Sequence, residues 1–307
     1  MLRILFFLAL LSSPLVQATP LDNCKMTAEQ IDESVATHLY GGPISSDDIY
    51  VRRGYLLAYN KEMYVPKYTM WKAEAAFRDT PKRTGRWKAF NQDPWLPDVS
   101  DDDYIGWYDS EFNYARGHMT PYFISGGDRN GNGIDAENEE TLVPEDYEDA
   151  CTVWEINSMA NVAPQYHQAF NGQSGLWYLL ETSIRRKIDQ GRQFYIIAGT
   201  LFDENKPLLR IGRRSQPESS WHIGVPHGFF KLVIDPVTQE SVLFVFDHAA
   251  DLEIGCDITN AETSLETCIR PVEELEAFTG YSFFSTLSLE ESQRYRRSSN
   301  PDTWTQW

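Results

Sequence analysis

Residues 175–246 constrain the fold most, because they predict one helix followed by three strands. Residues 175–190 repeat apolar side chains at helical spacing, carry basic residues in the last turn and stop at Gly191. The apolar face of this helix consists of Leu176, Leu179, Leu180, Ile184 and Ile188. Residues 194–201, 229–234 and 241–246 are apolar runs bounded by Gly, Pro and Asp, a pattern typical of buried strands. The segment therefore predicts a mixed α/β protein.

Weaker patterns extend this prediction to both sides. Residues 26–40 have the spacing of a short amphipathic helix, and residues 55–70 alternate like a hairpin that turns near Asn60-Lys61. Residues 271–279 predict another short helix, which ends at Gly280. The acidic cluster at residues 98–103 is interpreted most simply as a solvated loop. No repeat or linker-like break occurs in the sequence, which favours one domain.

The composition limits the partners of the chain. Hydrophobic residues make up 42% and aromatic residues 13%, too much for a disordered chain. The formal net charge of −18 opposes nucleic-acid binding by bulk charge, so a polyanion must meet a local basic patch. Basic clusters at residues 52–53, 82–88, 185–187 and 210–214 can line one cleft; alternatively, each is a solvated face that balances nearby acids.

The N-terminus has the three parts of a secretory signal peptide. Arg3 precedes an apolar run over residues 4–11, and Val16-Gln-Ala18 supplies small residues for cleavage. We therefore expect residues 1–18 to be removed and residues 19–307 to be secreted or periplasmic. Nothing after the signal is apolar enough to span a membrane, so no membrane association is expected after cleavage.

The mature chain carries an even number of cysteines, which suits two disulfides in an oxidising compartment. Cys256 and Cys268 flank a short polar stretch and form the natural local pair, which leaves Cys24 to pair with Cys151. Three connectivities exist, and the sequence does not choose among them. A zinc site is the weaker interpretation, because no C-x-x-C or matching histidine pair occurs.

Two segments carry residues suited to chemistry. Arg116 and His118 flank a glycine at a predicted strand end. Side-chain amides follow at Asn157, Asn161, Gln165 and Asn171. They run into the strongest predicted helix, which carries Glu181. Amides so concentrated beside a helix N-terminus suit a hard cation or an anion better than a core.

In these segments the chain resembles the DNA/RNA non-specific endonucleases, a family of ββα-metal nucleases. The family's Asp-Arg-Gly-His signature is similar to residues 115–118, and its Ser-Asn-x-x-Pro-Gln block to residues 160–165. Its Trp-x-x-Leu-Glu helix is similar to residues 177–181. Residues 195–202, 223–231 and 272–280 resemble its later strands and its penultimate helix. The resemblance covers residues 55–284, with the segments in the family's order.

The resemblance implies a single α/β (α+β) domain over residues 19–307, with a central, mainly antiparallel sheet flanked by helices and a ββα-metal active site. It also implies hydrolysis of phosphodiester bonds in DNA and RNA. A neutral imidazole accepts a proton from water at neutral pH, so His118 is the expected general base. Mg²⁺, with Mn²⁺ as the alternative, keeps most of its waters; by family analogy Asn171 is its ligand and Gln173 the alternate.

The other expected roles also follow from the resemblance. Arg116 or Arg86 can clamp a phosphate with a forked guanidinium, and Arg86 is preferred because its Arg-x-x-x-Phe-x-x-Asp run resembles the family's upstream arginine. Glu181 is expected to orient a water of the metal, and Asn161 to support His118 or that water network.

Two departures from the family pattern bear on activity. Ala115 stands where relatives have Asp, so a carboxylate near the metal is missing; either activity is reduced, or Asp109 or Glu111 substitutes. In addition, the intervals on either side of Asn171 are one and two residues longer than expected.

Two other functions remain open. The main alternative is a weakened or inactive secreted protein that binds Ca²⁺ or nucleic acid on the nuclease scaffold. Retention of His118, Asn161, Asn171 and Glu181 argues against it, because a binding protein does not need this set. A phosphodiesterase for a small substrate is a third hypothesis, which requires a closed pocket.

Residues 126–150 form an insertion that contains the D-x-[DN]-x-[DN]-G-x5-E pattern of an EF-hand-like calcium loop. The expected Ca²⁺ ligands are Asp128, Asn130, Asn132, the carbonyl of Ile134, and Glu139. The alternative is a polar, glycine-rich surface loop. In a secreted protein, millimolar external Ca²⁺ would fill even a weak site.

Overall fold

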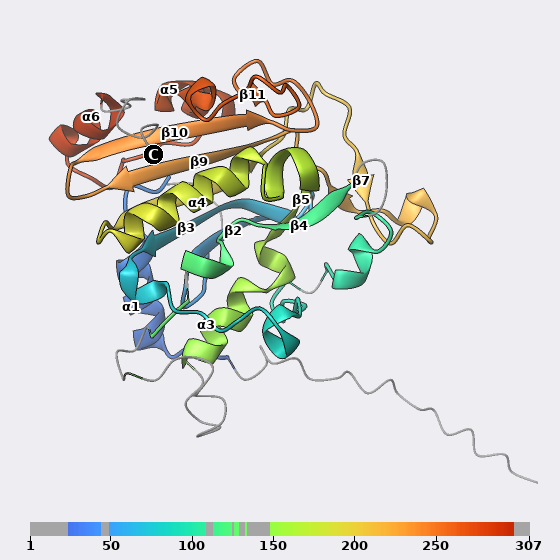
Figure 1. The fold of residues 1–307 in the computed structure, drawn as a ribbon, viewed down its shortest axis with the longest axis horizontal. Coiled ribbons are helices and arrows are strands. Elements are labelled where there is room, and N and C mark those ends of the chain that lie inside the picture. The colour runs from blue at the N-terminus through green and yellow to red at the C-terminus, as the bar shows by residue number, and fades with distance from the viewer. Residues whose placement is uncertain are drawn as a thin grey trace, which may run out of the picture.

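The computed structural model describes residues 24–43, 49–96, 98–108, 113–124, 126–128, 133 and 148–297. Its centre is an eight-stranded sheet in the order β1–β2–β3–β6–β9–β10–β11, with β12 paired to β10 (Figure 1). The strands are β1 (Ile49–Val51), β2 (Leu56–Asn60), β3 (Val65–Ala73), β6 (Phe194–Leu201), β9 (Gly228–Asp235), β10 (Glu240–Asp247), β11 (Cys256–Asp257) and β12 (Ile269–Arg270). Neighbouring strands are antiparallel except β10 and β11, which confirms the predicted mainly antiparallel sheet.

Helices cover both faces of this sheet (Figure 1). On one face, α4 (Leu176–Asp189) shares a core with the sheet and α3 (Glu148–Ile156). On the other, α5 (Val272–Thr279) and α6 (Leu289–Arg297) pack on the alternate side chains of the same strands. α1 (Ala28–His38) lies beside β1, β2 and β3. Every residue of β9 is therefore buried.

The elements predicted from the sequence are present. Residues 26–40, 175–190 and 271–279 contain α1, α4 and α5, the hairpin is β2–β3, and the three apolar runs are β6, β9 and β10. Local chemistry sets the ends: Thr27 and Gln30 form a capping box on α1, and Gly280 ends α5 in the left-handed region at φ +72°. The prediction for Leu179 is wrong, because this side chain is 41% exposed beside the buried stripe of α4.

A two-stranded ribbon lies outside the sheet and leads into α4. β4 (Tyr114–His118) pairs antiparallel with β5 (Val162–Tyr166), and a π turn at His167–Asn171 connects β5 to the helix. His248 directly follows β10, and its buried Nε2 accepts a hydrogen bond from the Tyr166 amide at 2.8 Å. This bond connects the β4–β5 ribbon to the end of β10. A second small ribbon pairs β7 (Arg210–Ile211) with β8 (Ile223–Gly224).

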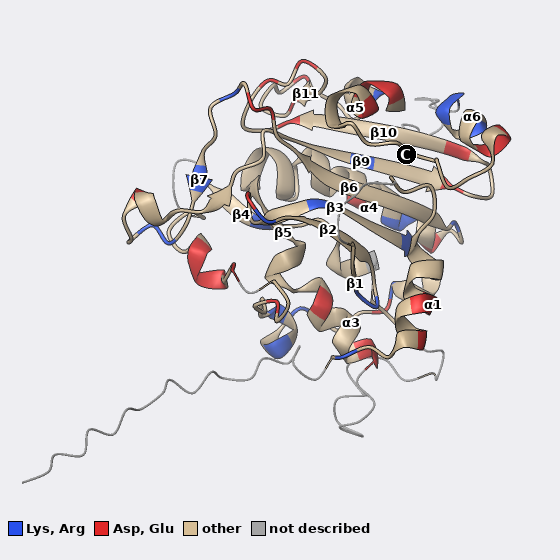
Figure 2. Ribbon diagram, turned by 180° about the vertical axis from the view of Figure 1, so that it is seen from behind, with Lys and Arg blue, Asp and Glu red and all other residues tan. Residues whose placement is uncertain are grey.

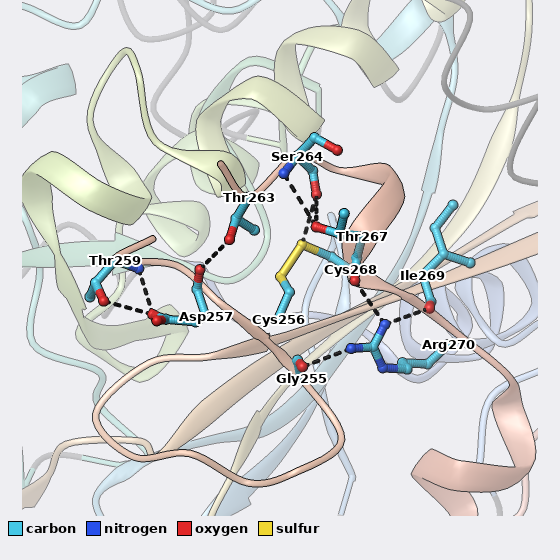
Figure 3. The surroundings of a disulfide bond; sticks show 10 residues. All are labelled: Gly255, Cys256, Asp257, Thr259, Thr263, Ser264, Thr267, Cys268, Ile269 and Arg270. Carbon is cyan, nitrogen blue, oxygen red and sulfur yellow. Dashed lines mark hydrogen bonds between the residues drawn. A yellow bond between two sulfur atoms is a disulfide. The ribbon is translucent and has the colours of Figure 1, made fainter. Parts of the chain in front are cut away.

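Both expected disulfides are present. Cys24–Cys151 joins two positions 127 residues apart and fastens the segment before α1 to α3. Cys256–Cys268 joins β11 to the turn before β12, where Arg270 also bonds the Gly255 carbonyl (Figure 3). Of the three possible connectivities, the structure has Cys24–Cys151 together with Cys256–Cys268.

Acidic and basic residues are interspersed along the whole chain, and α6 carries both kinds (Figure 2). Arg52 and Arg53 do not join the other basic clusters at one cleft, and each balances an acid, which is the alternative interpretation of this cluster. Arg52 is 4% exposed and pairs with the buried Asp93 at 2.8 Å, while Arg53 pairs with the buried Glu155 at 2.8 Å. No helix in the described ranges is long and apolar enough to cross a membrane.

Candidate active site

β4 places Arg116 and His118 on the same side of the ribbon, because side chains alternate along a strand. Both contact the ring of Phe90: the His118 ring centre lies 5.1 Å away, and the Arg116 guanidinium carbon 4.7 Å away. The guanidinium of Arg83 lies 5.1 Å from the centre of the same ring. The ring of Phe90 therefore contacts Arg83, Arg116 and His118, which come from two separate segments of the chain.

A hydrogen-bond chain fixes the tautomer of His118. The amide nitrogen of Asn157 donates to the Trp87 carbonyl at 2.9 Å, so its Oδ1 is the atom that faces Nε2 of His118 at 3.0 Å. An amide oxygen only accepts, so Nε2 must carry the proton. The lone pair of His118 is then on Nδ1, which has no hydrogen-bond partner among the described residues. Nδ1 is therefore the atom able to accept a proton.

The surroundings keep the His118 imidazole neutral. Burial is the main cause and the positive charge of Arg83 the next, and together they lower the pKa of His118 to about 3. The hydrogen bond to Asn157 acts in the opposite direction, and Arg116 adds to the lowering. At neutral pH the imidazole is thus uncharged and has its lone pair free.

Asn161 holds the chain that follows His118. Its buried side chain accepts from the Thr120 amide at 2.9 Å and donates to the carbonyls of Thr120 and Ile156, each at 2.9 Å. The Met119 amide donates to the Asn161 carbonyl at 2.9 Å. Asn161 therefore supports the position of His118 through the backbone.

A cavity of about 660 Å³ opens beside these residues. Its lining includes Arg83, Arg116, Tyr108, Ala115, Asp101, His167 and Asn171. Arg86 is exposed, stacks on Trp87 and is not part of this lining, although it lies close in sequence. Of the four basic clusters predicted from the sequence, the 82–88 cluster is the one that reaches the cavity, through Arg83 and Lys88.

The two cavity arginines differ in their partners. The Nε atom of Arg83 is buried without a hydrogen bond to any described residue, and burial lowers the pKa of this guanidinium. Arg116 forms an ion pair with Asp101. Asp101 lies in the acidic cluster interpreted as a solvated loop; its side chain is 50% exposed and also lines the cavity. A partly buried guanidinium without a carboxylate partner suits an anionic ligand such as a phosphate.

Asn171 reaches the cavity because of the π turn. This turn contains one residue more than an α turn needs, which accounts for the longer interval after Asn161. The Asn171 amide nitrogen donates to Gln165 Oε1 at 2.5 Å, so its Oδ1 is left without a donor from the described residues. A neutral oxygen ligand of this kind fits Mg²⁺, which retains several waters. Gln173 is exposed and does not line the cavity.

Glu181 lies on α4, outside the lining of this cavity. Its Oε1 is 3.0 Å from Nζ of Lys231, a residue in the middle of β9 that the sequence had not singled out. Within the described ranges, no group of three or more His, Cys, Asp or Glu side chains is arranged to hold a metal. Asn171 Oδ1 is therefore the neutral oxygen that the cavity offers to a hydrated metal ion.

Ala115 lines the cavity at the position where the resemblance expects Asp, and its suggested substitutes, Asp109 and Glu111, lie outside the described residues.

Of the expected calcium loop, the described residues include Asp128 and Gly133. The Gly133 amide donates to Asp128 Oδ2 at 2.8 Å, and Gly133 has φ +79°, as the sharp turn at position 6 of such a loop requires. The other expected ligands, Asn130, Asn132, Ile134 and Glu139, lie outside the described residues.

Comparisons with known proteins identify the family and the fold. A family model described as DNA/RNA non-specific endonuclease matches residues 36–290. A protein named nuclease from Nostoc sp. (strain PCC 7120) is 25% identical over 289 residues, which cover 91% of this chain and 92% of the relative. The crystal structure of the EndoG/EndoGI complex contains a chain with the same fold, with a TM-score of 0.56 and 20% identity over 87% of this chain and 96% of that chain.

Proposed function

This chain belongs to the DNA/RNA non-specific endonuclease family, and on that premise we propose that it is a secreted, Mg²⁺-dependent enzyme that hydrolyses phosphodiester bonds in both DNA and RNA. The observation that carries the proposal is a neutral imidazole, with its Nδ1 lone pair free, beside two arginines that line a cavity with Asn171.

His118 is the general base. Its Nδ1 accepts a proton from the attacking water, while Asn157 holds Nε2–H and stabilises the imidazolium that forms. Arg83 and Arg116 bind the scissile phosphate, and Arg116 exchanges Asp101 for it. A bound phosphate adds negative charge beside the imidazole, which raises the pKa of His118 and strengthens it as a base. Arg86 remains a candidate for contacts with phosphates farther along the nucleic-acid strand.

Asn171 is the residue that would hold Mg²⁺, through Oδ1. The bound ion would stabilise the negative charge that develops on the leaving oxygen. Glu181 would orient a water of the ion's hydration shell, the role that the resemblance assigns to it. Mn²⁺ takes similar oxygen ligands and is expected to replace Mg²⁺.

Cleavage assays with the mature chain test this proposal. Plasmid DNA and total RNA are incubated with residues 19–307 in Mg²⁺, in Ca²⁺, in both and in EDTA, together with His118→Ala and the matched control His222→Ala. We expect Mg²⁺-dependent cleavage of both polymers, a loss of roughly 10²- to 10⁴-fold in His118→Ala, and little change in His222→Ala. No cleavage by folded wild type under any of these conditions would refute the enzyme and favour the alternative with Ala115, a binding protein on the nuclease scaffold.

The same proposal includes two further features, the N-terminal signal peptide and the inserted calcium loop. Residues 1–18 act as a signal peptide, so the protein recovered from medium or periplasm should begin at Thr19; an N-terminus at Met1 would contradict this. The loop at residues 128–139 binds Ca²⁺, which the Asp128–Gly133 hydrogen bond supports. Asp128→Ala should abolish the Ca²⁺-dependent rise in thermal stability, and an unchanged rise would contradict the site.

A further inference from the structure

Lys231 is a fully buried cation whose position packing does not explain. It is 0% exposed in the middle of β9, on the face that it shares with the buried apolar side chains of Phe229 and Val233. Burying an ammonium group costs several kcal/mol unless good partners compensate, and apolar replacement of buried ion pairs is often neutral or stabilising. A lysine at this point therefore suggests a task other than stability.

The two partners of Lys231 both come from α4. Its Nζ lies 3.6 Å from the centre of the Trp177 ring and 3.0 Å from Oε1 of Glu181, one turn farther along the helix. The side chain of Glu181 is 14% exposed, and its other oxygen, Oε2, accepts no hydrogen bond from a described residue. Lys231 thus holds one carboxylate oxygen and leaves the other available.

We propose that Lys231 is a positioning residue of the nuclease site, which holds Oε1 of Glu181 and turns its Oε2 toward the hydration shell of the bound cation. The inference rests on the proposed role of Glu181. The cation–π contact with Trp177 fixes the ammonium group, so the carboxylate direction is set by the sheet and not by the mobile end of a side chain. Groups that orient the partners of a metal commonly change its affinity by 10- to 100-fold when removed.

A second ion pair offers a matched control. Arg192, just after α4, donates from Nε to the buried Oδ2 of Asp235 at 2.8 Å, at the end of the same strand β9. Arg192→Met therefore removes an anchor between the α4 end and β9 without touching Glu181. Lys231→Met removes the central pair and keeps an unbranched apolar chain of similar length. If Lys231 only anchored α4, the two variants would behave alike.

Mn²⁺ titration followed by electron paramagnetic resonance tests the inference without substrate. The signal assigned to the site is the Mn²⁺ binding that Asn171→Ala loses, which separates it from the calcium loop. In Lys231→Met we expect about 10-fold weaker binding at this site with an unchanged or raised Tm, and in Arg192→Met unchanged binding with a lowered Tm. Lys231→Gln serves as a second variant should the Met variant not fold.

A double-mutant cycle with Glu181→Gln distinguishes the possible failures. If Lys231 acts through Glu181, Lys231→Met should have no further effect on Mn²⁺ affinity in the Glu181→Gln background. Weak binding in Glu181→Gln but wild-type binding in Lys231→Met would overturn this inference alone. Equal, additive losses would also overturn it. Wild-type Mn²⁺ binding in Glu181→Gln would refute the proposed role of Glu181 itself, and the inference with it.

Discussion

At His118, burial and then the neighbouring charges decide the pH at which the imidazole loses its proton. Burial and Arg83 lower its pKa to about 3, far below the ordinary value of 6.5, so the base of the free enzyme stays neutral on both sides of pH 6.5. The acid limb of kcat/KM, which reports the free enzyme, should therefore lie well below pH 6.5.

Arg83→Met tests this cause. The variant removes a positive charge near His118, so the pKa of the imidazole rises and the acid limb of kcat/KM moves to higher pH. A pH profile with a short oligonucleotide measures the shift, and Arg86→Met, which removes an exposed charge, should leave the limb in place. Identical limbs in wild type and Arg83→Met would contradict the electrostatic account.

If Arg116 binds the scissile phosphate as proposed, Asp101 competes with the substrate for its guanidinium. Asp101→Asn should weaken this ion pair and tighten nucleic-acid binding, with KM falling by roughly 2- to 5-fold because exposed pairs contribute at most about 1 kcal/mol. Steady-state kinetics at low salt measures the effect. Asp102→Asn is the control, since Asp102 pairs with Arg213 and is absent from the cavity lining. A raised KM in Asp101→Asn would show that this carboxylate assists binding.

The residues at the site were only partly predictable from the sequence. His118, Arg116 and Asn171 lie in local sequence motifs, and the structure brings Arg116 and Asn171 to one cavity. Arg83 was predicted only as a member of the 82–88 cluster, because its contact with Phe90 depends on how the loop before Asp93 folds back. That loop is held by Asp93, which accepts buried hydrogen bonds from Arg52 and Ser158, and no local sequence pattern predicts these contacts.

Among the elements, the β4–β5 ribbon has a spatial requirement at Gly117. A Cβ atom on this residue would overlap Oε1 of Gln165, the acceptor that orients Asn171. Gly117→Ala should therefore displace Gln165, destabilise the protein by about 1–3 kcal/mol and weaken Mn²⁺ binding at Asn171.

Chemical denaturation and Mn²⁺ titration measure these effects of Gly117→Ala. The double variant Gly117→Ala/Gln165→Ser makes room for the methyl group, so it should recover stability but not the orientation of Asn171. An unaltered Mn²⁺ affinity in Gly117→Ala would mean that Gln165 does not set the direction of the ligand.

Helix prediction succeeded where burial is one-sided and failed where it is not. α4 is buried along one stripe, which gives the sequence a clear period. α3 is buried at nearly every position, and α6 buries Tyr295 alone, so neither has an apolar face that alternates with a polar one. The short strands β7, β8, β11 and β12 have only two residues each, too few for a pattern.

For the molecule as a whole, the two disulfides should contribute unequally to stability. In the chain-entropy model, Cys24–Cys151 closes a loop of 127 residues and restricts the unfolded chain by about 5 kcal/mol, against about 3 kcal/mol for Cys256–Cys268. Denaturant unfolding of Cys24→Ser/Cys151→Ser and Cys256→Ser/Cys268→Ser measures both values. The reverse order would show that native-state contacts, not loop length, set the contribution of each bridge.

The long-range disulfide also has a consequence for the organism that makes the protein. Cys151 lies on α3, and this helix ends next to Asn157, which orients His118. On the proposed function, a newly made chain in a reducing cytosol lacks the bridge, so the support of the proposed general base is weakest where the genome of its producer is within reach. Export and oxidation, if the chain is secreted as proposed, would complete the enzyme only after it has left, a form of self-protection built from covalent chemistry.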